Sequence, residues 1–133
     1  MSVDTIGNFL TIIRNAVGRA NNVIDVAYSN LKYDICRVLE QEGFIQSFVV
    51  EGEDLALNKK RLKVKLRYVH NESVIHEITQ VSTPGRRVYV RSESIPTVIN
   101  GLGIAVLTTS KGVMTDKQAR SCNIGGELIC TVW

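Results

Sequence analysis

One run of consecutive residues stands out as able to bind a ligand, namely Thr108-Thr109-Ser110-Lys111-Gly112. It offers three hydroxyls, one ammonium, and a glycine that lets a ligand approach the backbone closely. Hydroxyls and backbone amides can bond to base edges and to 2′-hydroxyl groups, which suits RNA that is recognised by its shape. Thr, Ser and Gly are also common in ordinary strand-to-helix turns, so this run alone leaves a turn and a binding site both open.

A second group of such side chains follows the pair Pro84-Gly85, which suits a type II turn. Strand alternation then places Arg87, Tyr89 and Arg91 on one face. An aromatic ring between two guanidinium groups can stack on a base while the arginines bind phosphates. Taken together, the two groups favour RNA as the ligand.

Basic residues are concentrated in one further segment, where six of the nine positions from Lys59 to Arg67 are Lys or Arg. Phosphate backbones attract clusters of this kind. The alternative is a solvated strand face, on which lysines guard a sheet edge against aggregation. The net charge of +3, from 16 basic and 13 acidic residues, adds only weak support for a polyanionic partner.

The same search finds no catalytic or metal-binding constellation. His70 and His76 have no second histidine or cysteine at a metal-ligand spacing. Gly101-Leu102-Gly103 lacks the third glycine of a dinucleotide site, and the hydroxyl run lacks the residue order of a phosphate loop. Asp116 and Glu127 do not form a catalytic pair of carboxylates. Asp116 is explained by a place in the first turn of a helix, and Glu127 by a place at the start of a strand. The sequence therefore predicts a protein that is not an enzyme and that uses no cofactor or metal.

The composition is that of a globular protein, because 44% of the 133 residues are hydrophobic and 22% are charged. We expect no membrane span, since no apolar run approaches about 18 residues, and no signal peptide, since Asp4 and Gly7 interrupt the N-terminus. Three cysteines without a C-x-x-C pair favour a reduced, cytoplasmic chain.

The elements that must position these groups begin with an amphipathic helix over the first twenty residues. One face of this helix is apolar, and the other carries small and amide side chains with a single arginine, so it suits docking or simple solvation equally. A strand at Val23–Ala27 follows, then a helix capped by Ser29 that ends near Gly43. Strands are predicted at Phe44–Val50 and around Leu62–Arg67, where apolar and basic residues alternate.

The pattern becomes rich in strands after a polar stretch at Tyr68–Ser73. Strands are expected at Val74–Val81, Val88–Arg91 and Ile104–Leu107, and a last strand follows Gly125-Gly126. Thr115 and Gln118 form a capping box for one short helix. The sequence thus predicts an α+β fold of two small domains. Residues 1–68 form an α-β-α-β-β domain, and residues 74–133 form an RNA-binding domain of mostly antiparallel β structure with one short helix.

Seven blocks, in order along the chain, resemble the bacterial small-subunit ribosomal protein S8 family over essentially its whole length. The two most specific are Thr109–Thr115 and Ile124–Glu127, and the others are Thr11–Ala16, Ser29–Lys32, Glu42–Ile45, Pro84–Tyr89 and Gly101–Ile104, with Val132-Trp133 at the end. The resemblance implies a cytoplasmic ribosomal protein with neighbouring small-subunit proteins as partners. It implies direct binding to the central domain of small-subunit rRNA early in assembly. In some bacteria the family also represses translation of its own mRNA.

The resemblance also implies which residues meet the RNA. Thr108, Thr109 and Ser110 would read it, with Lys111 near phosphate and Gly112 allowing close approach. Gly125, Gly126 and Glu127 would form the side of the RNA-binding pocket next to these residues. Arg87 and Tyr89 would lie on the strand that follows the Pro84-Gly85 turn. A second stretch of RNA would face Thr5, Arg14, Asn15 and Lys32.

Two positions depart from the family pattern: Thr108 stands where serine is usual, and Thr83 where a basic residue is frequent. A different class of function stays open beside RNA binding, namely a small-molecule-binding regulatory domain. If the chain were such a domain, Gly101–Gly103 and the hydroxyl run would line the pocket that binds the small molecule. An enzyme is the third hypothesis.

Overall fold

A computed structural model describes residues 4–52 and 59–133, and it confirms the predicted α+β class. Asp54, at the end of a polar turn expected at Glu51–Asp54, and Asn58, which precedes the basic segment Lys59–Arg67, lie outside these residues. Contacts divide the chain into two units, of which one spans Thr11–Ile75. The other joins His76–Trp133 to the described residues up to Leu10. Contacts do not test whether a segment folds alone, so the domain limits 1–68 and 74–133 remain a proposal.

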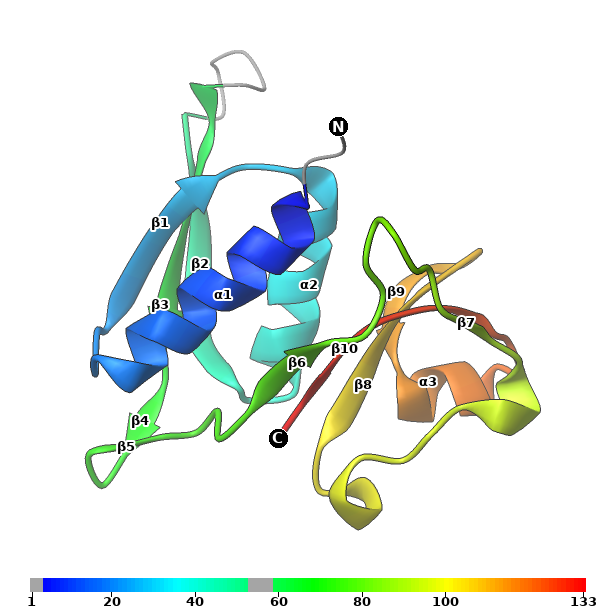
Figure 1. Ribbon diagram of the computed structural model, residues 1–133. Coiled ribbons are helices and arrows are strands. Elements are labelled where there is room, and N and C mark those ends of the chain that lie inside the picture. The colour runs from blue at the N-terminus through cyan, green and yellow to red at the C-terminus, as the bar shows by residue number, and fades with distance from the viewer. Residues whose placement is uncertain (1–3, 53–58) are drawn as a thin grey trace. The chain divides into compact units, whose positions relative to one another are not determined.

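The N-terminal elements follow the predicted α-β-α-β-β order (Figure 1). They are α1 (Thr5–Gly18), β1 (Val23–Ala27), α2 (Asn30–Gln41), β2 (Ile45–Glu51) and β3 (Arg61–Leu66), followed by the small hairpin of β4 (Tyr68–Val69) and β5 (Glu72–Ser73). Helix α2 begins where the cap was predicted, since the Ser29 Oγ accepts the Lys32 N–H at 3.2 Å. The Tyr28 and Tyr33 rings lie on either side of this start, 6.1 Å apart between centroids.

The sheet of this unit is antiparallel in the order β1-β3-β2. Strict alternation decides its two faces, because Leu62, Val64 and Leu66 of β3 are buried while the basic residues between them point to the open face. Ile24 and Val26 of β1 are buried on the same side. The alternation predicted for this strand is therefore confirmed.

The C-terminal elements form a second antiparallel sheet with one helix packed on it. They are β6 (Ile78–Gln80), β7 (Tyr89–Val90), the 3₁₀ turns η2 (Ser92–Ser94) and η3 (Ile99–Gly101), β8 (Ile104–Thr109), β9 (Gly112–Thr115), α3 (Asp116–Ser121) and β10 (Gly126–Val132). Strand β10 is central, since β8 pairs with it on one side and β6 and β7 pair with it on the other.

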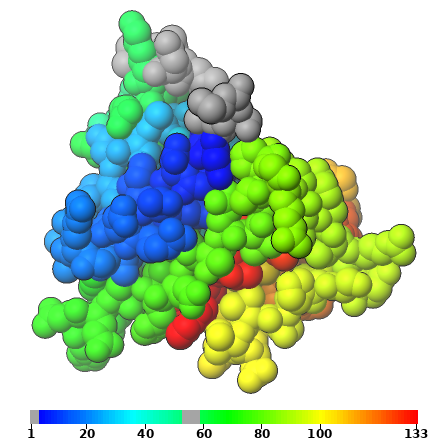
Figure 2. Space-filling view, viewed as in Figure 1, coloured from blue at the N-terminus to red at the C-terminus, as the bar shows by residue number. Residues whose placement is uncertain are grey.

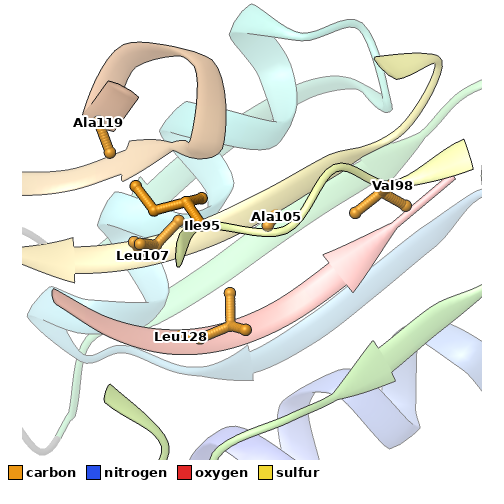
Figure 3. Close-up of a cluster of buried hydrophobic side chains, with 6 residues drawn as sticks. All are labelled: Ile95, Val98, Ala105, Leu107, Ala119 and Leu128. Atoms are coloured by element: carbon orange, nitrogen blue, oxygen red, sulfur yellow. The ribbon is translucent and has the colours of Figure 1, made fainter. Parts of the chain in front are cut away.

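An apolar cluster holds α3 and the 95–98 segment against this sheet. Figure 3 shows six side chains converging on it: Ile95, Val98, Ala105, Leu107, Ala119 and Leu128. The predicted capping box is present at the start of α3, where Thr115 and Gln118 exchange side-chain to backbone bonds of 3.1 and 3.2 Å. The buried Asp116 carboxylate adds a polar clamp, because it accepts the Ala105 N–H at 3.2 Å and pairs with Arg120 at 2.8 Å.

Three local predictions were wrong. The Pro84-Gly85 pair lies in a tight turn closed by reciprocal backbone bonds between Thr83 and Arg86, but Gly85 lacks the positive φ that a type II turn requires. The strands expected at 74–81 and 88–91 shorten to β6 and β7, because bonds to the Ser82 side chain and the Trp133 backbone replace ladder pairing at their ends. An additional strand, β9, lies between the hydroxyl run and α3.

Candidate nucleic-acid interface

The hydroxyl run forms the tip of the β8–β9 hairpin rather than a strand-to-helix loop. Thr109 pairs with Gly112, so Ser110 and Lys111 are the two turn residues. The Thr109 hydroxyl donates to the Gly112 carbonyl at 2.8 Å and accepts the Lys111 N–H at 3.1 Å. Gly112 has a φ of 111°, which favours glycine there. Thr109 and Gly112 therefore hold the turn that presents the other two residues.

Ser110 and Lys111 are the freely available groups at this tip. Both are exposed, and neither side chain has a hydrogen-bond or ion-pair partner in the part of the chain that the structure describes. Thr108 differs, because its Oγ1 is buried and unpartnered within residues 4–52 and 59–133. A hydroxyl in that state loses its hydrogen bonds to water, so a partner that reached it would recover them.

Glu127 and two glycines form the side of the site beside the hairpin. Glu127 pairs with Thr108 of β8 and with Tyr89 of β7, so these three residues share one row across adjacent strands. A Cβ on Gly126 would lie 2.2 Å from the Thr108 carbonyl oxygen, and one on Gly125 would lie 2.3 Å from the Val90 oxygen. Only glycine lets the three backbones approach so closely.

The Glu127 carboxylate is held by a small polar network. Its Oε2 accepts the Ser82 hydroxyl at 2.8 Å and pairs with the Arg87 guanidinium at 3.1 Å. The Ser82 Oγ in turn accepts the Val88 N–H at 2.9 Å. Sequence reasoning missed Ser82, and no local signal marks it, because its partner lies 45 positions further along the chain.

The predicted aromatic group is present in part. Tyr89 is 71% exposed, so its ring is available for stacking, and the Arg87 side chain is 53% exposed. Arg91 is exposed but precedes the η2 turn instead of sharing a strand with the other two. The structure thus brings together the hairpin tip, the start of β10, Arg87 and Tyr89.

Three of the predicted N-terminal contacts lie on α1. Thr5, Arg14 and Asn15 are all exposed; Arg14 and Asn15 lie away from the buried Phe9 and Ile13, whereas Thr5 is at the start of the helix, one turn before Phe9. Figure 2 shows this helix as a continuous exposed ridge, coloured blue.

Lys32, the fourth predicted N-terminal contact, lies elsewhere and is 9% exposed. Its ammonium donates to the Ala27 carbonyl at 3.1 Å. Burial, and secondarily the charge of Arg61, lowers the pKa of Lys32, while the neighbouring Cys36 raises it. In this conformation Lys32 closes the β1–α2 connection.

The basic cluster at Lys59–Arg67 is largely engaged within the protein. Arg61 pairs with Asp25 at 2.9 Å, and Lys63 pairs with Glu51 at 3.1 Å. Lys60 lies 5.4 Å from the Tyr28 ring centre, and Arg67 donates to the Gly43 carbonyl. Four of the six basic side chains of the cluster thus have contacts within the protein, two of them with carboxylates.

The described residues, 4–52 and 59–133, contain no group of three acidic, histidine or cysteine side chains placed to hold a metal ion. Over the same residues, no helix has the length and apolar character that crossing a membrane requires. Burial raises the pKa values of the Cys36 and Cys130 thiols to about 12, with a further contribution from Glu40 at Cys36.

Comparison with known proteins matches residues 4–133 to the family described as Ribosomal protein S8. A relative from Geotalea daltonii, named small ribosomal subunit protein uS8, is 52% identical over 132 residues, which cover 98% of this chain and 97% of the relative. A protein of the same name from Dictyoglomus turgidum is 48% identical over 130 residues, with 98% and 97% covered. One from Mesoplasma florum is 46% identical over 133 residues and covers both chains fully. The chain therefore belongs to the ribosomal protein S8 family.

Proposed function

We propose that this chain binds the central domain of small-subunit rRNA directly, through the β8–β9 hairpin tip and the start of β10, and so promotes assembly of the subunit. Family membership makes the chain a structural protein of the small ribosomal subunit and not an enzyme, as the sequence predicted. The proposal goes further, because it names the RNA region and the surface.

One observation carries the proposal: Thr108, Glu127 and Tyr89 lie in one row across three adjacent strands, beside an exposed turn of Ser110 and Lys111. A hydroxyl donates and accepts, and a carboxylate only accepts. Such a set suits 2′-hydroxyls and base edges in a shallow minor groove, whereas phosphates need the positive groups at its rim. Lys111 and Arg87 supply these.

Binding would proceed in two stages. Dispersed Lys and Arg side chains attract the RNA electrostatically and without regard to sequence. Ser110 then bonds to the RNA, Lys111 meets a phosphate, and the Tyr89 ring is available to stack on an unpaired base. The Thr109 bonds keep the turn rigid before contact, so little ordering free energy is lost on binding.

The arrangement favours RNA over a small-molecule pocket. Ser110 and Lys111 are exposed at a hairpin tip, where they enclose no ligand. Gly103 is packed tightly against the end of β10, since a Cβ there would lie 2.6 Å from the Val132 oxygen. Of the two segments that would line such a pocket, the hydroxyl run projects as a hairpin tip, and Gly103 is packed against β10 with no space for a ligand.

The test is Ser110→Ala, titrated against a transcribed central-domain fragment and an unrelated duplex RNA over a series of salt concentrations. We expect specific affinity to fall by about 1 to 2 kcal/mol, the value of one interfacial hydrogen bond, while binding to the duplex is unchanged. Ser121→Ala is the matched control, because Ser121 is an exposed serine at the end of α3. Unchanged affinity of the Ser110 variant for the fragment would refute the assignment of the hairpin tip.

The same surface supports a second function, repression of the chain's own mRNA, provided that the mRNA folds into a copy of the rRNA site. The contacts named above recognise a local shape and do not depend on which molecule carries it. The experiment is competition between the rRNA fragment and the leader of the mRNA. Independent, simultaneous binding of both RNAs would exclude a shared surface.

A further inference from the structure

One edge of the N-terminal sheet, formed by β2, lies outside the RNA contacts proposed above. Strand β2 pairs with β3 and, among residues 4–52 and 59–133, with no other strand. Every second backbone N–H and C=O of β2 therefore faces away from the sheet. Natural proteins usually protect such an edge with charged residues, proline or a bulge. Strand β2 contains no lysine or proline, its register irregularity lies at its start between Ile45 and Ser47, and its one charged residue, Glu51, lies at its end, so Phe48–Val50 form a regular, uncharged stretch of edge.

A groove of about 400 Å³ runs between this edge and α2. Tyr33 and Glu40 line it from the helix, and Phe48, Val49 and Val50 line it from the strand. The Tyr33 and Phe48 rings meet edge to face, 5.3 Å apart, and both line the groove. Phe48 and Val50 pair with the buried Val64 and Leu62 of β3 and so point toward α2, whereas Val49 pairs with Lys63 and points to the open face of the sheet. The groove is thus built of apolar and aromatic groups next to unpaired strand backbone.

The charge of the groove selects its ligand. Glu40 is the one charged residue in its lining, is exposed, and has no ion-pair partner among the residues that the structure describes. Glu42 lies exposed just beyond the helix. Two unneutralised carboxylates repel a phosphate backbone and attract a cation. The groove on the α2 side of this edge therefore has the opposite electrostatic character to the hairpin tip.

We propose that this edge binds an extended segment of another small-subunit protein, which adds as a strand beside β2 and places a Lys or Arg against Glu40. Backbone bonds to β2 would supply affinity, and an apolar side chain over Tyr33 and Phe48 would supply specificity. The inference rests on the proposed function, because it places the partner in the same subunit.

The experiment replaces Val50, which lines the groove on the α2 side of the sheet, with the photo-crosslinking residue p-benzoylphenylalanine in the full chain and assembles the variant into small subunits from purified rRNA and proteins. We expect a cross-link to one ribosomal protein, mapped by mass spectrometry to an extended segment that contains Lys or Arg. Backbone amides of β2 should exchange hydrogen more slowly in the subunit than in the free chain.

Two charge reversals test the role of Glu40. Glu40→Lys should lower the cross-link yield about fivefold, the effect expected for one surface ion pair. Glu72→Lys is the control, because Glu72 is exposed in the β4–β5 hairpin and lies outside the groove. A yield that both variants leave unchanged would overturn the pairing with Glu40.

Other outcomes identify other occupants and overturn the proposal. A cross-link to rRNA would assign the groove to RNA, and one to a second copy of this chain would assign it to self-association. A chain that fails to enter the subunit would refute the proposed function. The cross-linker is then tested against an RNA-free mixture of purified small-subunit proteins, where the absence of a cross-link would refute this inference separately.

Discussion

The close approach of β8 and β10 makes Gly126→Ala the most informative single substitution. The added Cβ would lie 2.2 Å from the carbonyl oxygen of Thr108 and 3.0 Å from its carbonyl carbon, and both atoms belong to the backbone. Because a Cβ essentially never lies within 3.0 Å of such atoms, the two strands must part by about 1 Å. Gly126 has no positive φ, so the expected effect is steric.

The magnitude follows from what that displacement disturbs. Inserting a methyl group into closely packed structure costs about 1 to 3 kcal/mol, and we expect a loss of about 2 kcal/mol in the free energy of unfolding. The shift also moves Thr108 away from Glu127, its neighbour in the row. We expect affinity for the central-domain RNA fragment to fall about tenfold, roughly one hydrogen bond.

Urea denaturation measures the stability, and RNA titration without urea measures the affinity of the folded variant. Gly85→Ala is the control, because a Cβ there would meet nothing within 4 Å and the residue lacks a positive φ. Its stability should stay within about 0.5 kcal/mol of the parent. If Gly126→Ala were as stable as this control, the steric reasoning would be wrong. If Gly126→Ala lost stability but kept its affinity for the RNA fragment, Gly126 would have no role in RNA binding.

Three further outcomes are expected. Lys63→Ala combined with Lys65→Ala should lower affinity for cognate and unrelated RNA equally, since phosphate contacts carry no sequence information. Parallel filter-binding titrations with the two RNAs check this. A loss of affinity confined to cognate RNA would contradict it. Asp116→Ala should reduce the free energy of unfolding in urea by about 3 kcal/mol, because it leaves Arg120 without its buried partner; a loss below 1 kcal/mol would refute that role. Burial raises the pKa of Cys130 from 9.0 to about 12, so its thiol stays protonated in the folded chain while the unfolded chain ionises it. Its contribution to stability is complete below pH 9 and falls by about 1.4 kcal/mol per pH unit up to pH 12. Urea midpoints at pH 7 and 10 should therefore differ less for Cys130→Ala than for the parent chain, and equal differences would exclude this cause.

The features that could be predicted from the sequence are those decided by neighbouring residues. The Ser29 cap, the Thr115–Gln118 capping box and the alternation in β3 each depend on side chains within a few positions of one another. Local rules of capping and period therefore sufficed for them. The hydroxyl run was identified for the same reason, since its residues are consecutive.

What could not be predicted depends on pairing between distant segments. Strand β9 has four residues, of which only two are apolar, and it forms because β8 is beside it. The bond from Ser82 to Glu127 and the ion pair between Arg61 and Asp25 likewise follow from tertiary pairing. The sequence consequently left open whether the cluster at 59–67 binds phosphates or forms a solvated strand face, and it could not show that most of these charges have partners within the protein.

The central place of β10 sets the order in which the protein can become functional during its synthesis. All strand pairs of the C-terminal sheet except β8–β9 include Gly126–Val132. The segment Thr11–Ile75 is complete long before these residues are made. A nascent chain that stops earlier lacks Glu127 and the two glycines, and its hairpin has no strand to pair with. A chain released before Gly125 would therefore lack part of the RNA-binding surface proposed above, and we expect it to bind the central-domain RNA more weakly than the full chain.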